Sequence, residues 1–338
     1  MPEYHTIIAG AGPAGLACAA ALAHAGKRVL VLERHRRIGP KVCAGGITWS
    51  GINKRIPAEL IERSFPGQEV FTGWQKTTIS GAAPLISTIN RETLGRWMLG
   101  AAVAAGVEVK TATAVRSFSG NRLRTDCGEF AFRFLVGADG STSTVRRLLG
   151  IGTDRVGVGI NCFVPGDFPA MEWHLNDKLF ANGYAWVFPH RQAASIGAYC
   201  DRNSLPPARL RKNLHLWATK HGINLEHSKM TAAMINCDFR GWRFANCFLA
   251  GDAAGLASPL TGEGIYPAIV SGEEIARTIL DPGYDSAAMK KLLARHRLHR
   301  GVVSLTGSSR PACRLVMEAL VLALRSGLIP FTALEMAG

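Results

Sequence analysis

A glycine-rich turn near the N-terminus contains the residues whose spacing points most directly to chemistry. Gly10, Gly12 and Gly15 follow a short apolar run at residues 6–9 in the pattern G-x-G-x-x-G. Gly10 permits a tight turn out of a strand, and Gly12 lets the backbone approach a pyrophosphate. Gly15 lets the following helix pack closely on a sheet. This arrangement of glycines is typical of dinucleotide binding.

The residues after this turn complete a strand–helix–strand unit. Pro13 and Ala14 begin an alanine-rich segment, where the free N–H groups of a helix start would face phosphates. A second apolar strand at residues 29–32 ends at Glu33. An acid about 20 residues after the glycines is expected to bond a ribose hydroxyl. Strand, glycines, helix, strand and acid occur in the order that predicts a dinucleotide site.

A basic, glycine-containing loop follows at residues 34–46. One interpretation is a solvated loop. The other is that Arg34 flanks the adenosine ribose while the backbone of Gly45 and Gly46 lies against a cofactor. The residues themselves leave both interpretations open.

Two later turns each combine an acid with glycine. Asp139 follows an apolar strand, and it either caps the helix beginning near Ser143 or contributes to a cofactor site. Gly251 and Asp252 follow another strand and precede a long helix at residues 263–280. Small residues in this turn let the chain approach a ligand, and the amides at the helix start would face a negative pole.

Hydrophobic periodicity predicts the elements that position these residues. A helix–strand step and a small meander lie between the first two landmarks, and longer β-type runs lie between the second and third. The predicted elements are a helix at 91–105, a strand at 107–110, a meander at 115–136, strands at 156–164, 171–175, 183–189 and 193–199, and a helix at 205–221. The sequence therefore predicts an α/β fold with a separate sheet facing the nucleotide lobe.

Composition limits the classes of partner. The chain has 338 residues, with 39 Lys and Arg against 25 Asp and Glu, for a net charge of +14. An anionic membrane, a diphosphate-bearing substrate or a general solubility effect would account for this balance. We expect no nucleic-acid partner, because no helix-turn-helix, zinc-finger or RNP-type pattern accompanies the charge.

The cysteines and the N-terminus bear on the compartment. The eight cysteines are scattered without a C-x-x-C pair or a zinc-type spacing, so we expect reduced thiols and no metal site. The N-terminus leads directly into the nucleotide unit, so we expect no cleavable signal peptide. These features together predict a cytoplasmic protein.

In this order, the three landmarks resemble the FAD-binding pattern of the para-hydroxybenzoate-hydroxylase-like flavoproteins. The resemblance implies FAD as cofactor, bound by a Rossmann-type, glutathione-reductase-like domain. It also implies an interleaved antiparallel β-sheet substrate domain and a helical C-terminus. The implied segments are 1–75, 91–150 and 241–282 for FAD binding, 76–90 and 151–240 for the substrate domain, and 283–338 for the C-terminal helices.

The resemblance also implies roles for particular residues. Arg91 would contact the ribityl–phosphate region, Asp252 would bond the ribityl chain, and residues 259–265 would lie under the isoalloxazine. Asp139 would serve FAD packing and, in some members, NAD(P)H. The expected cofactor-binding residues are Gly10, Gly12, Pro13, Ala14, Gly15, Glu33, Arg34, Cys43, Ala44, Gly45, Arg91, Asp139, Gly251, Asp252, Pro259, Gly262, Gly264 and Ile265. A second Rossmann fingerprint is absent from the sequence, so we expect no separate nicotinamide domain.

Within that superfamily, three stretches are similar to the geranylgeranyl reductase branch. Residues 41–46 resemble its K-x-C-G-G loop, residues 184–189 its Y-x-W-x-F-P pattern, and residues 259–265 its flavin-side loop. The sequence departs from the branch at Ala44, where glycine is usual, and at Ala181, where proline is expected.

The branch implies a FAD-dependent reductase that hydrogenates C=C bonds of a geranylgeranyl or other prenyl chain on a diphosphate, lipid or quinone. Hydride would come from N5 of the reduced flavin, with NAD(P)H or another electron donor as reductant. Cys43, Tyr184 and Trp186 are the candidate catalytic residues, although a cysteine that only packs is an equal interpretation of Cys43. The aromatic residues of 173–188 would suit a long apolar chain, or simply form core.

Two other functions stay open on the same scaffold. One is an NAD(P)H-dependent flavin monooxygenase of a small aromatic substrate, and the other is electron transfer from flavin to a quinone. Near the C-terminus, a basic helix at 290–300 and an apolar one at 315–324 are too short and charged to span a bilayer. We favour a helical cap over the substrate domain, and peripheral contact with the inner, anionic face of a membrane is the alternative. The sequence predicts no particular oligomeric state.

Overall fold

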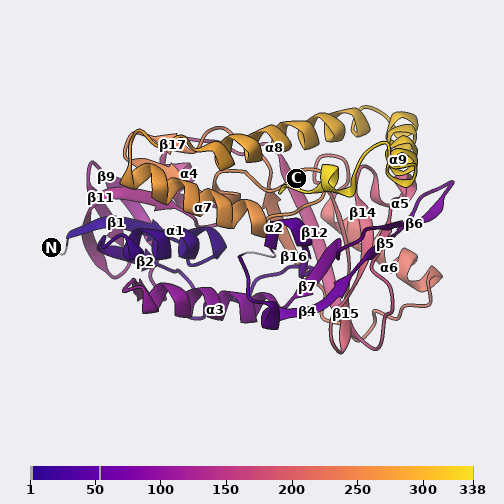
Figure 1. Ribbon diagram of the computed structural model, residues 1–338, viewed down its shortest axis with the longest axis horizontal. Helices are drawn as coiled ribbons and strands as arrows, with labels where there is room; N and C mark the ends of the chain where they lie inside the picture. The colour runs from indigo at the N-terminus through magenta and orange to yellow at the C-terminus, as the bar shows by residue number, and fades with distance from the viewer. Residues whose placement is uncertain (1–2, 53–54, 338) are drawn as a thin grey trace.

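A computed structural model describes residues 3–52 and 55–337, which form an α/β fold, as predicted (Figure 1). Its two larger sheets are mixed. An eight-stranded sheet lies at one end of the molecule and a seven-stranded sheet at the other. A three-stranded antiparallel sheet consists of β3 (Gly46–Thr48), β4 (Ile61–Phe65) and β7 (Ile86–Ile89).

The eight-stranded sheet brings the sequence landmarks to one edge. Its strands are β1 (Glu3–Ala9), β2 (Val29–Leu32), β8 (Glu108–Lys110), β9 (Val115–Ser119), β10 (Arg122–Thr125), β11 (Gly128–Gly137), β17 (Arg243–Phe244) and β18 (Cys247–Leu249). Strands β18, β11, β1, β2 and β8 are parallel neighbours in that order, while β9, β10 and β17 pair antiparallel. Because parallel strands end at the same edge, the turns after β1, β2, β11 and β18 lie together there, which is where such sheets bind ligands.

Helices cover this sheet, and small residues allow them to approach. They are α1 (Pro13–His24), α3 (Arg91–Ala104), α4 (Thr144–Leu148) and α7 (Ile265–Leu280). Asn90 caps α3 because its side-chain oxygen accepts bonds from the amides of Glu92 and Thr93 at 2.9 and 3.1 Å. Helices α1 and α7 pack so closely that a Cβ on Gly272 would lie 2.2 Å from the carbonyl oxygen of Ala14.

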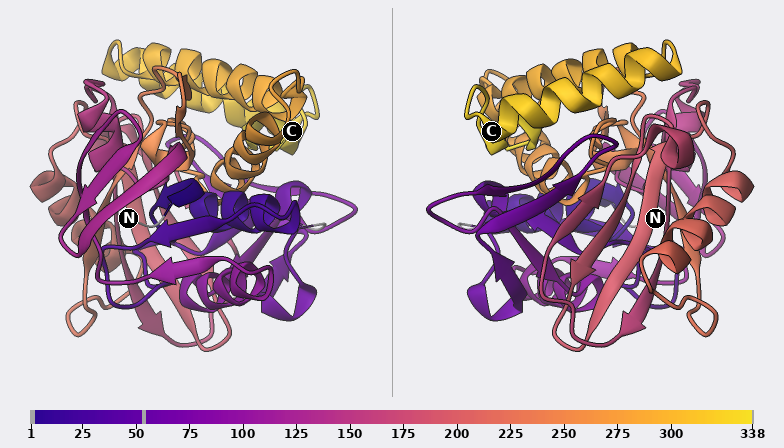
Figure 2. Two further views of the ribbon diagram at one scale, coloured as in Figure 1. Left: turned by 90° about the vertical axis from the view of Figure 1, so that its left-hand side faces the viewer. Right: turned by 90° about the vertical axis from the view of Figure 1, so that its right-hand side faces the viewer.

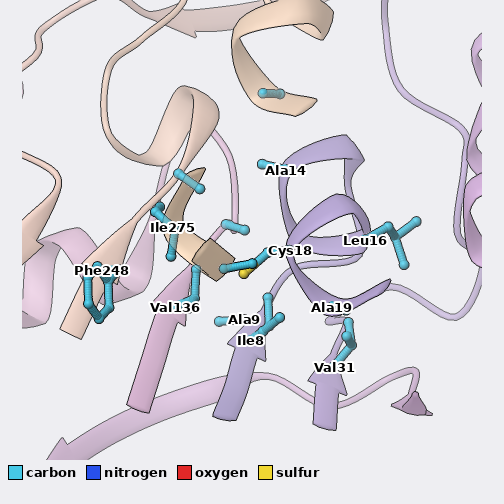
Figure 3. Packing of buried hydrophobic residues seen from close by; sticks show 14 of the residues in the cluster. Ile8, Ala9, Ala14, Leu16, Cys18, Ala19, Val31, Val136, Phe248 and Ile275 are labelled. Carbon is cyan, nitrogen blue, oxygen red and sulfur yellow. The ribbon is translucent and has the colours of Figure 1, made fainter. Parts of the chain in front are cut away.

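The core of this lobe lies between the parallel strands and α1 (Figure 3). Ile8 and Val31 extend from neighbouring strands beneath Ala19 and are fully buried. Val136 and Phe248 continue the same core on β11 and β18. A parallel sheet covered on both faces buries both sides of each strand, which explains why the sequences of these strands are continuous apolar runs.

The seven-stranded sheet contains all of the predicted β-type runs. Its strands are β5 (Gly67–Phe71), β6 (Lys76–Ser80), β12 (Val156–Pro165), β13 (Glu172–His174), β14 (Tyr184–Pro189), β15 (Ala193–Asp201) and β16 (Thr231–Asn236), in the order β16-β12-β15-β14-β13-β5-β6. All neighbours are antiparallel except β13 and β5. Strand β5, which lies in the segment 1–75 expected to bind FAD, belongs to this sheet. Helix α6 (Pro207–Lys220) packs on it through Leu210, Leu214 and Trp217.

The C-terminal part is helical and returns to the middle of the molecule. Helices α8 (Ala287–Thr306) and α9 (Arg310–Arg325) run along one side, above both sheets in Figure 2. Glu318 joins α9 to the turn between β5 and β6 by accepting bonds from Thr72 and Gln75 at 2.7 and 2.8 Å. Within residues 3–52 and 55–337, no helix has the length and apolar character needed to cross a bilayer.

Candidate cofactor and substrate site

A cavity of about 490 Å³ begins at the edge where the parallel strands end and continues to the seven-stranded sheet. Its size is within the usual range for small-molecule sites. The three candidate catalytic residues all line it. So do all the expected cofactor-binding residues except Gly15, Gly45, Gly251 and Pro259.

Three of the four exceptions are glycines at positions where the backbone needs space. A Cβ on Gly15 would lie 2.0 Å from the carbonyl oxygen of Gly10. One on Gly45, whose φ is +81°, would lie 2.6 Å from the His190 ring, and Gly251 has a φ of +54°. These glycines therefore shape the wall by close packing.

The glycine turn leaves open space where a pyrophosphate would lie. Gly10 has a φ of +105°, and a Cβ there would lie 2.3 Å from the carbonyl oxygen of Ala138. A Cβ on Gly12 would meet no described atom within 4 Å, although Gly12 lines the cavity. The start of α1, at Pro13 and Ala14, lines the same space. The turn is thus rigid at Gly10 and open at Gly12, as a phosphate cradle requires.

The Glu33 carboxylate is held at the end of β2 by two backbone amides. It accepts bonds from the N–H groups of Ala11 and His35, both at 2.9 Å. Arg34, the next residue, also lines the cavity. The backbone thus orients an acid at the position expected to bond a ribose.

Arg91 is a buried cation without a hydrogen-bond partner for one of its nitrogens. Its side chain lies at the start of α3 and lines the cavity, and the residue is 9% exposed. The Nη1 atom is buried and bonds to no described atom. Burial lowers the pKa of the guanidinium, while Cys43 and Asp252 act in the opposite direction. A buried guanidinium nitrogen without a hydrogen-bond partner is costly, so its position fits an anionic group of a bound ligand.

Asp252 and Asp139 differ in how they are bonded. Asp252 accepts bonds from Lys41 Nζ at 3.1 Å and Ser141 Oγ at 3.0 Å. Asp139 accepts bonds from Ser143 Oγ at 2.5 Å and from the amide of Thr144 at 2.6 Å. Burial raises the pKa of Asp139, and these bonds oppose the rise. Asp139 therefore holds the start of α4, as the capping interpretation predicted, and it lines the cavity as well.

The candidate catalytic residues line the cavity from two segments, Cys43 from the loop before β3 and Tyr184 and Trp186 from β14. The Sγ atom of Cys43 accepts a bond from the Gly45 amide at 3.4 Å. Tyr184 donates from its hydroxyl to the carbonyl oxygen of Thr261 at 2.5 Å, and burial raises its pKa. The indole N–H of Trp186 donates to Ser195 Oγ at 3.1 Å.

Aromatic rings form much of the cavity wall on the side of the seven-stranded sheet. Trp173, Tyr184 and Trp186 come from β13 and β14, and adjacent ring centroids lie 6.0 Å apart. Phe331 comes from the C-terminal segment and stacks on Trp173 at 5.7 Å. The seven-stranded sheet and the end of the chain therefore enclose an apolar space next to the nucleotide motifs.

Comparisons with known proteins agree with this geometry. Residues 3–161 match the FAD binding domain family. The chain is 26% identical to digeranylgeranylglycerophospholipid reductase 2 of Methanopyrus kandleri, over 86% of this chain and 81% of that protein. It is also 26% identical to geranylgeranyl diphosphate reductase of Rhodobacter capsulatus, over 82% of this chain and 75% of that protein. The chain is a FAD-dependent oxidoreductase with geranylgeranyl reductase homologues. The resemblance predicted from the motifs is confirmed.

A solved structure shows the same fold. The geranylgeranyl bacteriochlorophyll reductase-like protein of Thermoplasma acidophilum superposes with a TM-score of 0.82 at 20% identity, covering 100% of this chain and 96% of that one. The match to an FAD binding domain supports FAD as the cofactor. The open glycine turn, the anchored Glu33 and the unbonded Nη1 atom of Arg91 fit that group.

The structure also places two acids in this flavoprotein's cavity that the sequence analysis did not select. Glu263 accepts bonds from the Met336 amide at 3.0 Å and from Thr48 Oγ1 at 3.2 Å. Burial raises its pKa to about 7. Glu335 is 2% exposed and bonds to Ser50. A charged residue inside the glycine-rich loop was a signal for Glu263, whereas no local pattern connects Glu335 with the cavity.

Proposed function

We propose that this flavoprotein reduces C=C bonds of a prenyl chain attached to a phosphate-containing head group. The observation that supports it most strongly is one cavity that joins the dinucleotide motifs to an aromatic wall. Relatives named for a digeranylgeranyl phospholipid and for geranylgeranyl diphosphate support the substrate class, because both molecules combine a prenyl chain with phosphate. FAD, when bound and reduced, would supply hydride from N5.

The residues at the strand ends would hold the cofactor. Gly12 and the start of α1 would accept the pyrophosphate, Glu33 would bond the ribose, and Arg91 would neutralise phosphate charge. Asp252, positioned by Lys41 and Ser141, would bond the ribityl chain. The FAD lobe would have a glutathione-reductase-like arrangement, and its segments would alternate with those of the substrate domain, to which β5 would belong.

The aromatic wall would hold the prenyl chain and exclude water. The Tyr184 hydroxyl is already bonded to Thr261, and Trp186 to Ser195, so both rings are fixed and present apolar faces. Cys43 lies in the loop that would face the flavin. Its side chain would shape that face.

Peripheral attachment to an anionic membrane on its cytoplasmic side would bring this enzyme to a lipid substrate. Exposed leucines recur seven residues apart on one face of each C-terminal helix, and a further one follows α9. These are Leu298 and Leu305 on α8, Leu315 and Leu322 on α9, and Leu328, with exposures from 53% to 80%. Arg297, Arg300 and Arg325 are exposed beside them. Leucine next to arginine is the pattern of a helix that lies on an anionic interface.

The test is anaerobic reduction by purified protein with FAD bound. The flavin is reduced with dithionite, and geranylgeranyl diphosphate or a geranylgeranylated phospholipid is added. We expect flavin reoxidation together with products that gain two hydrogens per step by mass spectrometry. The two substrates distinguish a free diphosphate from a lipid head group.

Two other outcomes would contradict the proposal and indicate a different function. Consumption of NAD(P)H and oxygen with an aromatic ligand, while the prenyl chain stays unsaturated, would make the protein a monooxygenase. Reoxidation by a quinone whose side chain stays unchanged would make it an electron-transfer flavoprotein.

A further inference from the structure

The reduction needs a proton as well as a hydride, and the cavity contains one buried acid suited to supply it. Glu263 lies two residues before the start of α7, in the loop expected to lie under the isoalloxazine, and lines the cavity with Tyr184 and Phe331. Its two oxygens accept bonds from different segments, Thr48 in β3 and the Met336 amide near the C-terminus. The carboxyl is therefore fixed in position at the wall.

A second carboxyl group makes full ionisation at this place unfavourable. Glu335 is buried, lines the same cavity and raises the pKa of Glu263 through its charge, in addition to the larger effect of burial. Two neighbouring buried carboxyls retain a proton more strongly than either would alone. The titratable and charged groups around the pair are Tyr184 on β14, Tyr266 on α7 and Arg295 on α8, which acts on Glu335.

The other hydroxyl and carboxyl groups in this part of the cavity are poorer acids or are already engaged. Tyr184 and Tyr199 donate to the carbonyl oxygens of Thr261 and Pro259 at 2.5 and 3.0 Å. Burial raises the pKa of both phenols, so neither gives up a proton readily. Asp252 is engaged in an ion pair with Lys41 at 3.1 Å and accepts a further bond from Ser141 Oγ.

We propose that Glu263 is a catalytic residue that donates the proton in reduction of the prenyl double bond, an inference that rests on the proposed function. One alkene carbon takes hydride from the reduced flavin, and the other takes the proton from the Glu263 carboxyl group. The π bond is replaced by two C–H bonds, Glu263 becomes a carboxylate, and the flavin is oxidised by two electrons. Solvent then reprotonates the carboxylate before the next step.

The first experiment is a single turnover of the dithionite-reduced holoenzyme with geranylgeranyl diphosphate, followed by flavin absorbance. Replacing Glu263 by Gln keeps the shape and removes the proton, so we expect reoxidation to slow about 100-fold or more. Wild-type reoxidation should fall as the pH rises through about 7, where Glu263 loses its proton. The E263Q rate should lack this dependence, and E263D, which keeps an acid, should recover part of the rate.

A second variant tests the coupling between the two acids. E335Q removes the neighbouring negative charge, so the wild-type decline should move to lower pH. The matched control is E273Q, which removes a carboxyl from the same helix α7, where Glu273 forms an ion pair with Arg55 at 2.9 Å. Glu273 does not line the cavity, so the rate and pH profile should match the wild type.

A direct readout is the infrared C=O stretch of a protonated carboxylic acid in the oxidised holoenzyme without substrate. We expect a band that disappears as the pH rises through about 7 and is absent from E263Q. A wild-type rate and pH profile in E263Q, or the lack of this band in the wild type, would overturn the proposal. If the wild type reduces no prenyl substrate, the proposed function itself fails, which differs from an active wild type beside an equally active E263Q.

Discussion

Two glycines of the same turn should respond oppositely to the same substitution. A methyl group at Gly12 would enter open cavity space, with no described atom within 4 Å. Gly12 has φ −80° and ψ 179°, which alanine adopts readily. A methyl group at Gly15 would lie 2.0 Å from the backbone oxygen of Gly10. We therefore expect Gly12→Ala to impair FAD binding and Gly15→Ala to impair folding.

The expected magnitudes follow from these environments. For Gly12→Ala, the stability of the FAD-free protein should change by less than about 1 kcal/mol. Alanine is a poorer N-cap than glycine, which destabilises the fold, but it also lowers the backbone entropy of the unfolded chain, which stabilises the fold. FAD affinity should fall at least about 10-fold if the methyl displaces the pyrophosphate by even a few tenths of an ångström. Gly15→Ala should destabilise the FAD-free protein by about 1–3 kcal/mol or more through overpacking against backbone.

The assay combines urea unfolding of FAD-free protein with FAD titration followed by flavin fluorescence. Unfolding midpoints report stability independently of cofactor, since ligand binding would otherwise raise them. Gly26→Ala is not a suitable control because Gly26 has a φ of +72°. Gly100 is a better one, since it lies in α3 and a Cβ there meets no described atom. Wild-type FAD affinity in Gly12→Ala would refute the placement of the pyrophosphate at this turn.

Three further predictions concern other parts of the molecule. Arg91→Gln should weaken FAD binding about 10-fold or more in the same titration. It should leave the stability of FAD-free protein equal or higher, because a buried charge with an unbonded Nη1 atom is removed. Folding raises the pKa of Glu263 from 4.5 to about 7, so the folded protein holds this proton more tightly than the unfolded chain. The resulting contribution to the free energy of unfolding is complete below pH 4.5 and is lost as the pH rises through 7. Its size is on the order of 3 kcal/mol. Urea unfolding should show this loss between pH 5 and 8 in the wild type and not in E263Q. Leu305→Glu with Leu328→Glu should reduce sedimentation with phosphatidylglycerol vesicles, while leaving turnover of a water-soluble diphosphate substrate unchanged.

The nucleotide half could be predicted from sequence because its signals are local. Gly10, Gly12 and the acid at the end of β2 lie within one strand–helix–strand unit, so their spacing determines their geometry. The runs that form β12 to β15 were also evident from their length and apolar content. The α/β class followed from these two patterns together.

The parts that sequence analysis could not place depend on contacts between distant segments. The strands within residues 46–52 and 55–89 belong to two different sheets, so no single periodic pattern describes this stretch. Phe331 lines the cavity only because α8 and α9 return the chain to Trp173. The departure at Ala181 has a local cause that a sequence pattern does not show. Its φ of 52° is a backbone conformation that the expected proline cannot adopt.

The arrangement of the cavity wall explains why one acid can hold a proton beside a cofactor with negative phosphates. The only strongly buried cation that the described part of the chain places on the wall is Arg91, at the start of α3. Glu263 is instead bonded to a threonine hydroxyl and a backbone amide, which stabilise a carboxylate less than a cation does. Positive charge is thus concentrated where phosphates would bind. At the apolar end of the cavity, burial and the charge of Glu335 raise the pKa of Glu263 to about 7. Under the proposed function, this separation would let one cavity bind an anion and deliver a proton.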